Sequence, residues 1–456
     1  MTTVGSARSR RQCASVRAAA AALLLVLLVA CSGGGSARTA STASDIVLGV
    51  GADESQRIVT WHSSGDTAQV VQVAATATVD GGAFPADASS FAATGGANDD
   101  GDGYHRDATV TGLEAGTTYS YRVGAEGAWS PVYSFVTGPS GPDFDFLFFG
   151  DPQIGASGDT AADTAGWADT LSVAVSSDPA PELLVGAGDE TNAGSNQTQW
   201  EGFFSPDQLR QVPWVATVGN HDVGSASFDQ HHTTPNTDGQ PPAGTSGSDY
   251  WFVYKGVLFV VLADSQGDNN AHLAFVTDVV HAHGADARYT VLIYHHSIYS
   301  AAVHAKDRDI KTRREDYPAV FSALGVDLVL QGHDHAYTRS YVIADGHKAD
   351  PAEQPGQADV VAGPGGVVYV TAGSSSGSKY YELSKPDGTA TSGGGNGADP
   401  LDPSSYWYGS VQSQEHVRTY TRVEVRDDGL VVDTVRAEAS AAGPVGSSVD
   451  RVTIHR

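Results

Sequence analysis

Seven polar residues that could bind metal follow short apolar segments along the chain. They are Asp151, Asp189, Asn220, His221, His295, His333 and His335. Carboxylate and amide oxygens together with imidazole nitrogens suit borderline divalent or trivalent metals. In α/β folds such ligands gather where strands end, because the loops at the carboxyl edge of a sheet converge there. The set therefore predicts a hydrolytic centre with two metal ions.

The elements that would position these residues are short apolar strands alternating with helical patterns. We expect buried strands at residues 144–149, 183–185, 214–218, 257–262, 290–294 and 327–330, and helices around 162–175, 271–283 and 313–324. Strands followed by helices are typical of α/β architecture. Stretches rich in Gly, Asp and Pro at 233–248 and 386–404 predict extended surface loops.

An earlier region, from about Ile46 to residue 137, has a different period. Runs of β-branched and aromatic residues, such as 69–73 and 119–123, are separated by Gly, Asp and Ala turns. This pattern predicts a small antiparallel sandwich. A Gly/Pro/Ser break at 138–142 predicts the domain boundary, so we expect a first domain at 46–140 and a second at 143–456.

The first 30 residues have the pattern of a secretory signal. Four arginines precede an apolar run at 18–30, which is too short for a stable membrane anchor. Its end, Leu28-Val29-Ala30-Cys31, resembles the lipobox of bacterial lipoproteins, in which the cysteine is lipidated. We therefore expect a signal at 1–30, a lipid anchor at Cys31 and a flexible tether at 31–45. The protein would be extracytoplasmic and held on a bacterial membrane, or secreted if Cys31 is not lipidated.

Charge limits the partners. The formal net charge is −27, and removing a signal with four arginines would make it more negative. Such a field repels polyanions, so no nucleic acid is expected as a partner. The basic cluster at 306–314 also contains acidic residues and is best explained as a solvated helix start. Nothing in the pattern indicates an obligate protein partner.

Five local motifs occur in a fixed order. They are Gly150-Asp151-Pro152-Gln153, Gly188-Asp189, Gly219-Asn220-His221-Asp222, Tyr294-His295-His296 and Gly332-His333-Asp334-His335. Together they resemble the calcineurin-like metallophosphoesterases, in particular the purple acid phosphatase branch. The segment 113–135 resembles the fibronectin type III-like module that precedes the catalytic domain in that branch. The resemblance covers the chain from about residue 46 to the end, with 448–454 as a closing strand.

The resemblance implies a role for each ligand. Asp189 would bridge two metals, with Asp151 and His335 on the first and with Asn220, His295 and His333 on the second. A bridging carboxylate holds two ions about 3.5–4 Å apart, so that one supplies hydroxide at neutral pH and both neutralise phosphoryl oxygens.

Further histidines would act on the substrate or beside the ligands. His221 would contact phosphate and protonate the leaving oxygen, with Asp222 tuning it; otherwise it is a solvated turn residue. His304 is a candidate for a second phosphate contact. His296 is the alternative to His295 as ligand, although the position of Tyr299 favours His295.

Two positions depart from the family. The tyrosine that binds ferric iron in purple acid phosphatases is replaced by Asn192, and a histidine used by other metallophosphoesterases is replaced by Gln153. Gln153, Asn192 or water would complete the first site. Without the phenolate the protein should not be purple, and Fe, Mn and Zn become comparable candidates.

These inferences give one expected architecture and function. The fold class is an all-β, fibronectin type III-like sandwich followed by an α/β metallophosphoesterase domain, a four-layer β-sandwich flanked by helices. The resemblance implies metal-dependent hydrolysis of phosphate esters, first of all phosphomonoesters, with metal-bound hydroxide as nucleophile and a small phosphorylated molecule as substrate. The same ligands would serve a phosphodiesterase or pyrophosphatase, and a non-catalytic surface protein with a structural metal site is the competing class.

Overall fold

A computed structural model describes residues 41–176, 180–239, 241, 245–384 and 406–456. The expected signal, Cys31, most of the tether and the 386–404 loop lie outside these residues, as does part of the 233–248 loop. Among the described helices, none is both long and apolar enough to cross a membrane.

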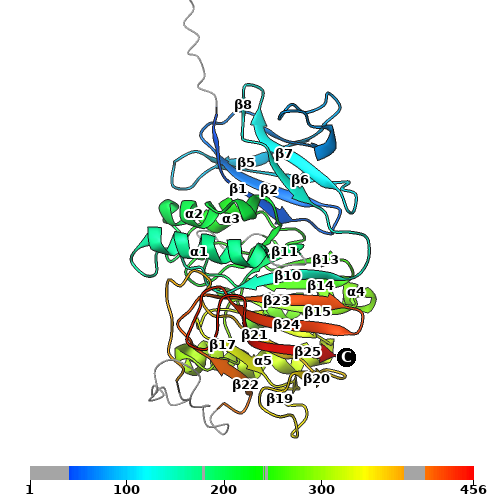
Figure 1. The fold of residues 1–456 in the computed structure, drawn as a ribbon, viewed down its shortest axis with the longest axis vertical. Helices are drawn as coiled ribbons and strands as arrows, with labels where there is room; N and C mark the ends of the chain where they lie inside the picture. The colour runs from blue at the N-terminus through cyan, green and yellow to red at the C-terminus, as the bar shows by residue number, and fades with distance from the viewer. Residues whose placement is uncertain (1–40, 177–179, 240, 242–244, 385–405) are drawn as a thin grey trace, which may run out of the picture. The chain divides into compact units, whose positions relative to one another are not determined.

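The first region is a sandwich of two antiparallel sheets (Figure 1). Its strands are β1 (Ala43–Val50), β2 (Arg57–Ser63), β3 (Val70–Ala75), β4 (Ser89–Ala92), β5 (Thr94–Ala97), β6 (Tyr104–Val110), β7 (Thr118–Ala125), β8 (Ala128–Trp129) and β9 (Tyr133–Val136). Strands β1, β2, β6 and β5 form one layer, and β4, β3, β7 and β8 form the other, with β9 paired to β7. Alternate residues of both layers, including Trp61 and Tyr121, fill the core between them.

The first strand begins earlier than the sequence predicts. The predicted tether runs to residue 45, but β1 starts at Ala43. Its pairing with β2 shifts register between Ser44 and Val47, and Asp45 has a positive φ of 48°. This bulge interrupts the apolar alternation, which becomes regular only from Ile46, so the pattern alone placed the start too late.

The sandwich and the second region share a sheet. Strand β1 pairs in parallel with β12 (Trp214–Val215) through Gly49 and Trp214. One eleven-stranded sheet therefore runs from the second region into the first layer of the sandwich. A break in composition at 138–142 marks where the chain crosses over, but pairing between distant strands leaves no local signal there.

The second region is built on two sheets packed face to face. The remaining strands of the large sheet are β10 (Phe144–Phe149), β11 (Leu183–Gly186), β20 (Asp359–Val361), β23 (Thr419–Arg426), β24 (Gly429–Arg436) and β25 (Ser448–His455). The facing sheet contains β13 (Tyr250–Tyr254), β14 (Val257–Leu262), β15 (Tyr289–Tyr294), β16 (Leu328–Gln331), β17 (Tyr337–Ser340), β21 (Val368–Thr371) and β22 (Gly409–Ser413). A short ribbon joins β18 (Ile343–Ala344) and β19 (His347–Lys348).

Helices cover the two outer faces. They are α1 (Thr160–Val175), α2 (Gln197–Phe204), α3 (Ser227–His231), α4 (Asn269–His283) and α5 (Arg308–Leu324), with single 3₁₀ turns at Thr76–Thr78, Asp207–Arg210, Gly284–Asp286 and Val303–Lys306. Phe146 of β10 packs between the sheets while its neighbour Leu147 packs with α1 and α2. In the same way Ile293 of β15 faces the other sheet and Leu292 faces α4 and α5.

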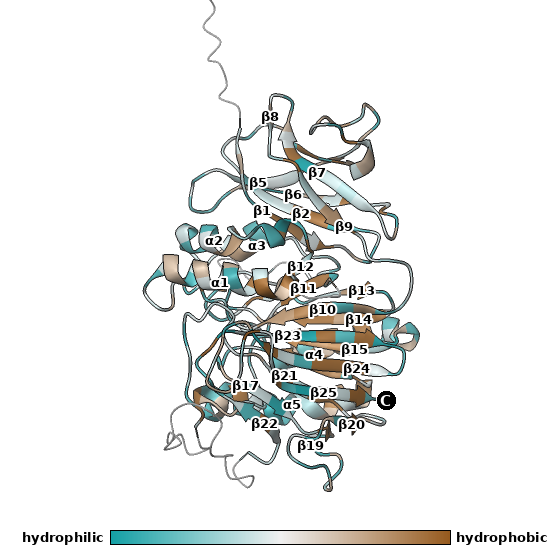
Figure 2. Ribbon diagram, viewed as in Figure 1, coloured by the Kyte–Doolittle hydropathy of each residue, from teal (hydrophilic) through white to brown (hydrophobic). Residues whose placement is uncertain are grey.

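Both faces of these strands are therefore buried, which explains their largely apolar sequences; β10 and β14 are mostly brown in Figure 2. The layers run helix, sheet, sheet, helix, as expected for the second domain.

Candidate metal centre

Six of the seven predicted side chains come together at the carboxyl ends of strands. Asp151 follows β10, Asp189 follows β11, Asn220 lies beyond β12, His295 follows β15, and His333 and His335 follow β16. We call these six residues the strand-end cluster. The first three come from one sheet and the histidines from the facing sheet, so the cluster forms where the edges of the two sheets meet.

The cluster contains two triads that share Asp189. One consists of Asp189, His295 and His333, the other of Asp151, Asp189 and His335, and in each triad one ligand atom per residue lies within 4.8 Å of the others. His295 Nε2 lies 3.3 Å from Asp189 Oδ2 and 3.0 Å from Asn220 Oδ1. His335 Nε2 lies 3.7 Å from Asp151 Oδ1. This arrangement has room for two ions with Asp189 between them.

Backbone carbonyls orient two of the rings. His295 Nδ1 is 2.9 Å from the Ala187 carbonyl oxygen, and His335 Nδ1 is 3.0 Å from that of Lys379. A carbonyl accepts only from an N–H, so Nδ1 of each ring carries a proton and Nε2 faces the cluster, with its lone pair free in the neutral ring. Second contacts of this kind fix ring orientation in metal sites.

Unusual backbone conformations are concentrated here. Among the described residues, ten that are not glycine have positive φ, and five of them are Asp151, Gln153, Asp189, His333 and His335, with φ from 34° to 73°. Such conformations cost about 1–3 kcal/mol each and persist where surrounding structure enforces them. Their gathering at one place indicates that ligand placement has taken precedence over local backbone preference.

The glycines of the motifs allow close approach of the loops. A Cβ on Gly219 would lie 2.1 Å from the Asp189 backbone nitrogen, and one on Gly332 would lie 2.6 Å from Asp151 Oδ2. Neither contact is possible for a side chain. Glycine therefore precedes Asn220 and His333 because only a residue without a side chain allows the two neighbouring loops to pack this closely.

The electrostatics favour a bound cation. Burial raises the pKa of Asp151 to about 8. Burial also acts to raise the pKa of Asp189, but the charge of His295 and its hydrogen bond outweigh this and lower it to about 2. Burial lowers the pKa of His335 to about 3 and that of His333 well below its ordinary value. Burial acts to lower the pKa of His295, but the charge of Asp189 and its hydrogen bond raise it to about 10. His295 thus carries the positive charge that a metal ion would replace, while His333 and His335 are neutral and have lone pairs to give.

Gln153 and Asn192 flank the Asp151 half of the cluster. Gln153 Nε2 lies 3.4 Å from Asn192 Oδ1, and Gln153 Oε1 is buried with no hydrogen-bond partner among the described residues. A buried amide oxygen without a partner is costly unless a cation or water satisfies it. The residues present therefore fit a metal at this half, with Gln153 as the better placed neutral oxygen.

His221 lies beside the cluster, partly buried. Its backbone N–H donates to Asp189 Oδ1 at 2.9 Å, and its Nδ1 is 2.8 Å from the Asn192 carbonyl oxygen. That carbonyl requires a proton on Nδ1, which leaves Nε2 unprotonated in the neutral ring. The position agrees with a role outside the ligand set.

Asp222 braces two loops of the site. Its buried carboxylate accepts hydrogen bonds from the backbone N–H groups of Glu190, Thr191 and Gly219 at 3.0–3.1 Å. It therefore ties the Asp189 loop to the Asn220 loop. The tuning of His221 by Asp222 stays a prediction.

Two further histidines pack against His333. The His304 ring centroid lies 4.2 Å from that of His333, and His304 Nδ1 is 2.7 Å from Asp307 Oδ2, so His304 does reach the cluster. His296 Nδ1 instead faces Asp264 Oδ2 at 3.2 Å. His295, not His296, is the member of the pair that meets Asp189.

Sequence reasoning missed three residues at this site. Asp264 accepts the backbone N–H of His295 at 3.0 Å; burial acts to raise its pKa, but the charge of His296 holds it well below its ordinary value. The ring of Tyr381 lies 5.1 Å from the rings of both His304 and His335, and Lys379 Nζ lies over it at 4.6 Å.

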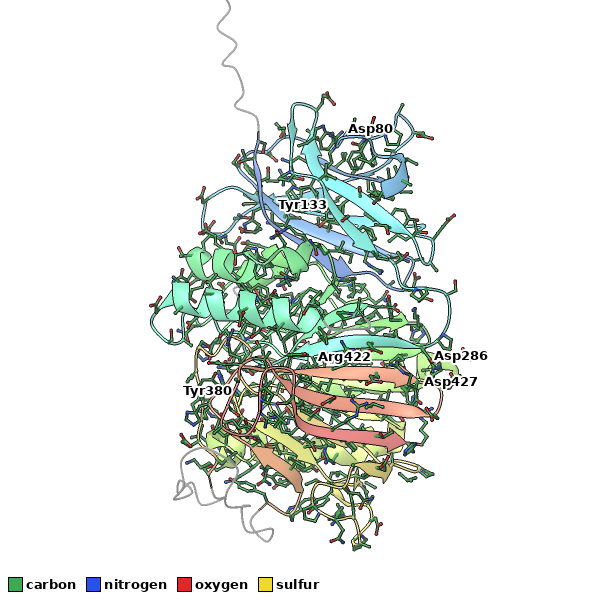
Figure 3. All side chains as sticks on the ribbon, viewed as in Figure 1. Asp80, Tyr133, Asp286, Tyr380, Arg422 and Asp427 are labelled. Atoms are coloured by element: carbon green, nitrogen blue, oxygen red, sulfur yellow. The ribbon has the colours of Figure 1, made fainter. Side chains whose placement is uncertain are left out.

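Lys379 and Tyr381 flank Tyr380 (Figure 3), in a segment whose sequence has no metal-ligand motif. Only the apolar run before Asp264, at β14, could have drawn attention to it.

Comparison with known proteins identifies both regions. The profile for the purple acid phosphatase N-terminal domain matches residues 43–137, and that for calcineurin-like phosphoesterases matches residues 144–337. The chain therefore carries a purple acid phosphatase N-terminal domain followed by a calcineurin-like metallophosphoesterase domain.

Individual relatives agree. Purple acid phosphatase 22 of Arabidopsis thaliana is 29% identical over 268 residues, 56% of this chain and 57% of the relative. Fe(3+)-Zn(2+) purple acid phosphatase 12 of the same plant is 26% identical over 261 residues, 52% of each chain. The structure of purple acid phosphatase PPD1 from yellow lupin (Lupinus luteus) seeds superposes with a TM-score of 0.68 at 15% identity, covering 91% of this chain and 75% of that one. The chain thus spans little more than half the length of the curated relatives it matches.

Proposed function

We propose that the protein is a metal-dependent phosphoesterase that hydrolyses phosphomonoesters at the strand-end cluster. The observation that carries the proposal is the pair of ligand triads sharing Asp189 in a domain matched by the calcineurin-like phosphoesterase profile. Relatives named as phosphatases support the reaction class. Two bound metals would supply a nucleophilic hydroxide at neutral pH and neutralise the phosphoryl oxygens.

Each ligand has a defined place in this proposal. Asp189 would be shared by two metals, Asp151, His335 and the Gln153 oxygen would hold the first, and Asn220, His295 and His333 would hold the second. The absence of a phenolate at Asn192 weakens selection for ferric iron, so Fe, Mn and Zn all fit the donor set. One relative is named for Fe(3+) and Zn(2+), which supports a mixed site without fixing the metals here.

Proton transfer falls to His221. Its Nδ1 is engaged by the Asn192 carbonyl, so a protonated ring can give only its Nε2 proton to a leaving alkoxide. The Asn192 carbonyl holds the ring in one orientation. The substitution of tyrosine by asparagine at position 192 therefore leaves the backbone contact to His221 in place.

Substrate contacts beyond phosphorus are assigned to His304, Lys379 and Tyr381. These three residues border the same side of the cluster, where His333 is partly exposed. A cation here offsets the acidic field of the protein for an anionic substrate. The aromatic ring of Tyr381 offers an apolar face to an aryl or alkyl leaving group.

The test is a phosphate-release screen coupled to metal analysis. Metal-stripped protein is reconstituted with Fe, Mn or Zn and assayed on an aryl phosphate, a diester, a nucleotide and pyrophosphate at several pH values. We expect the monoester to be hydrolysed fastest. Preference for the diester or pyrophosphate would replace the monoesterase assignment, and no hydrolysis with any metal would favour the non-catalytic alternative.

We further propose that the chain is anchored on the outer side of a bacterial membrane by lipid at Cys31. The support is the arginine-rich, apolar segment ending in Leu-Val-Ala-Cys. A Cys31→Ser variant should move from the membrane fraction to the soluble fraction. An unchanged membrane fraction would contradict the anchor.

A further inference from the structure

A second cluster of metal-type side chains lies where the sandwich meets the second domain. It consists of Asp45 on β1, His62 on β2 and His231 at the end of α3, and one ligand atom from each lies within 4.8 Å of the others. We call it the junction cluster. None of its residues belongs to the motifs of the strand-end cluster.

The junction cluster is almost dry. His231 is 1% exposed and His62 is 8% exposed, and the Asp45 side chain is 9% exposed. The two imidazole rings are stacked with centroids 4.0 Å apart. His62 Nδ1 lies 3.6 Å from Asp45 Oδ2. A carboxylate and two imidazoles are thus held together away from bulk water.

His231 is the unexplained member. Both of its ring nitrogens are buried, and neither has a hydrogen-bond partner among the described residues. Trp200 and Phe204 lie against the ring at 4.8 and 4.9 Å, so this part of its surroundings is apolar. A phenylalanine would fill such a place without leaving two polar atoms unsatisfied. The imidazole must therefore have another use or be a net cost.

The other two residues are positioned toward it. Asp45 occupies the strand bulge with φ of 48°, and its Oδ2 accepts from Gln197 Nε2 of α2 at 2.9 Å. His62 Nε2 lies 3.2 Å from the Gln230 carbonyl oxygen, so in the neutral ring that nitrogen carries the proton and Nδ1 keeps its lone pair. Asn98 Nδ2 is 3.5 Å from this Nδ1, a long hydrogen bond that a metal ion would replace. That lone pair is on the side of the ring that approaches Asp45.

We propose that the junction cluster binds one divalent transition-metal ion, Zn²⁺ or a similar ion, through Asp45, His62 and His231. One oxygen and two imidazole nitrogens are a donor set that such ions favour. Ligand atoms at about 2.0–2.2 Å from an ion lie closer together than the widest separation in the cluster, so the two stacked rings would have to tilt to bring their nitrogens together on binding.

The proposed ion has a structural role. It joins strands β1 and β2 of the sandwich to helix α3 of the second domain. Its function does not depend on the proposed hydrolysis, because no junction residue is in the strand-end cluster. Metal binding should therefore add to thermal stability without being needed for turnover.

The experiment counts metal and measures unfolding in matched variants. His231→Phe keeps the ring volume and removes both nitrogens, and Asp45→Asn keeps the shape and removes the charge. His283→Phe is the control, because His283 is also stacked on an aromatic ring, Trp251, at 3.9 Å, but lies on α4. Each variant is made in the wild-type and Asp189→Asn backgrounds, stripped of metal and titrated with Zn²⁺.

We expect His231→Phe and Asp45→Asn each to bind one Zn²⁺ fewer than their parent in both backgrounds. At free Zn²⁺ about 100-fold above the dissociation constant, the parent should gain about 3 °C in Tm from this site, and the two variants should lose that gain. His283→Phe should bind as many Zn²⁺ ions as its parent and should show the same Zn²⁺-dependent gain in Tm.

An unchanged Zn²⁺ count and unchanged Zn²⁺-dependent Tm in folded His231→Phe would overturn the proposal. If His231→Phe does not fold, Asp45→Asn alone decides by the same two readings. If His231→Phe binds as many Zn²⁺ ions as its parent and has a higher Tm with or without Zn²⁺, the imidazole is only an unsatisfied core residue and the proposal is wrong.

Discussion

The strand-end cluster and the junction cluster use the same residue types in different settings. The first is built from loops with five positive-φ residues and is open on the side of Asn220, His221 and His304. The second is built mainly from a strand pair and a short helix and is nearly sealed. Accessible and strained ligand sites suit chemistry, whereas buried ligands suit stability. The difference teaches that ligand type alone does not distinguish a catalytic site from a structural one.

Removal of the shared carboxylate should have the largest effect. Asp189→Asn keeps the shape but removes the charge between both triads. We expect turnover of an aryl phosphate to fall by about 10⁴-fold or more, together with loss of metal from the strand-end cluster. Steady-state kinetics and metal analysis measure this, and the Zn²⁺-dependent Tm gain of the junction cluster should persist. If Asp189→Asn loses the Zn²⁺-dependent Tm gain as well as turnover, the two clusters are not independent.

The next effect separates proton transfer from metal binding. His221→Ala removes a residue that touches the Asp189 loop but lies outside the ligand triads. We expect kcat to fall by about 10²- to 10³-fold while metal content stays unchanged. A variant that lost metal in proportion to activity would instead make His221 a ligand.

Gln153 tests whether the strand-end cluster is complete. Gln153→Leu keeps the volume of the buried side chain but removes its unpartnered oxygen. We expect affinity for the first metal to fall by roughly 10-fold or more, while Gln153→Glu should bind metal more tightly. Competition with a chelator measures both. Equal metal affinities in the wild type, Gln153→Leu and Gln153→Glu would mean that Asn192 or water, not Gln153, completes the first metal site.

A smaller effect is expected at the border of the site. Lys379→Met removes the cation beside Tyr381 but retains an apolar stem. We expect KM for an anionic substrate to rise by about 10-fold with little change in kcat, and the rise should shrink at high salt. Lys311→Met, on the exposed side of α5, is the control. A fall in kcat at unchanged KM would contradict a binding role.

The smallest effect concerns a buried histidine that belongs to neither cluster. His272 Nδ1 lies 2.7 Å from Asp249 Oδ2; burial acts to lower the pKa of His272, but the hydrogen bond and charge of Asp249 raise it. The raised pKa means that this stabilisation is fully present below pH 6.5 and is lost as pH rises through the folded-state pKa.

His272→Gln should therefore cost about 1 kcal/mol at pH 6, and less at alkaline pH. Thermal unfolding of both proteins from pH 6 to pH 9 measures the difference. A cost that grows with pH would contradict the sign.

Much of the strand-end cluster could be predicted because its residues lie in short sequence motifs that directly follow apolar strands. The gathering of these six side chains, with His221 and His304 beside them, was expected from the order of the motifs and from the family resemblance that the motifs carry, and their roles as ligands stay a prediction. Strands β10, β11, β12, β14, β15 and β16 and helices α1, α4 and α5 were also predicted, since residues such as Phe146 and Leu147 face two different cores and leave an unbroken apolar run. Strands such as β13, β23 and β24 and the helices α2 and α3 were not predicted.

The remaining features depend on contacts between distant residues. The pairing of β1 with β12, the bracing by Asp222 and the approach of Tyr381 to His335 link positions far apart in the chain. His231 had no signal at all, because a histidine among aromatic residues on a short helix looks like a core residue. Only the unpaired nitrogens revealed by packing distinguish it.

The most direct test of the central claim is a metal reconstitution followed by two readings at once. Stripped wild-type protein is titrated with Zn²⁺, or with the metal that gives most activity, while phosphate release and Tm are recorded. We predict that His231→Phe recovers phosphate release in full but lacks one increment of stability, and that Asp189→Asn shows the reverse. Full phosphate release by Asp189→Asn would contradict the assignment of hydrolysis to the strand-end cluster.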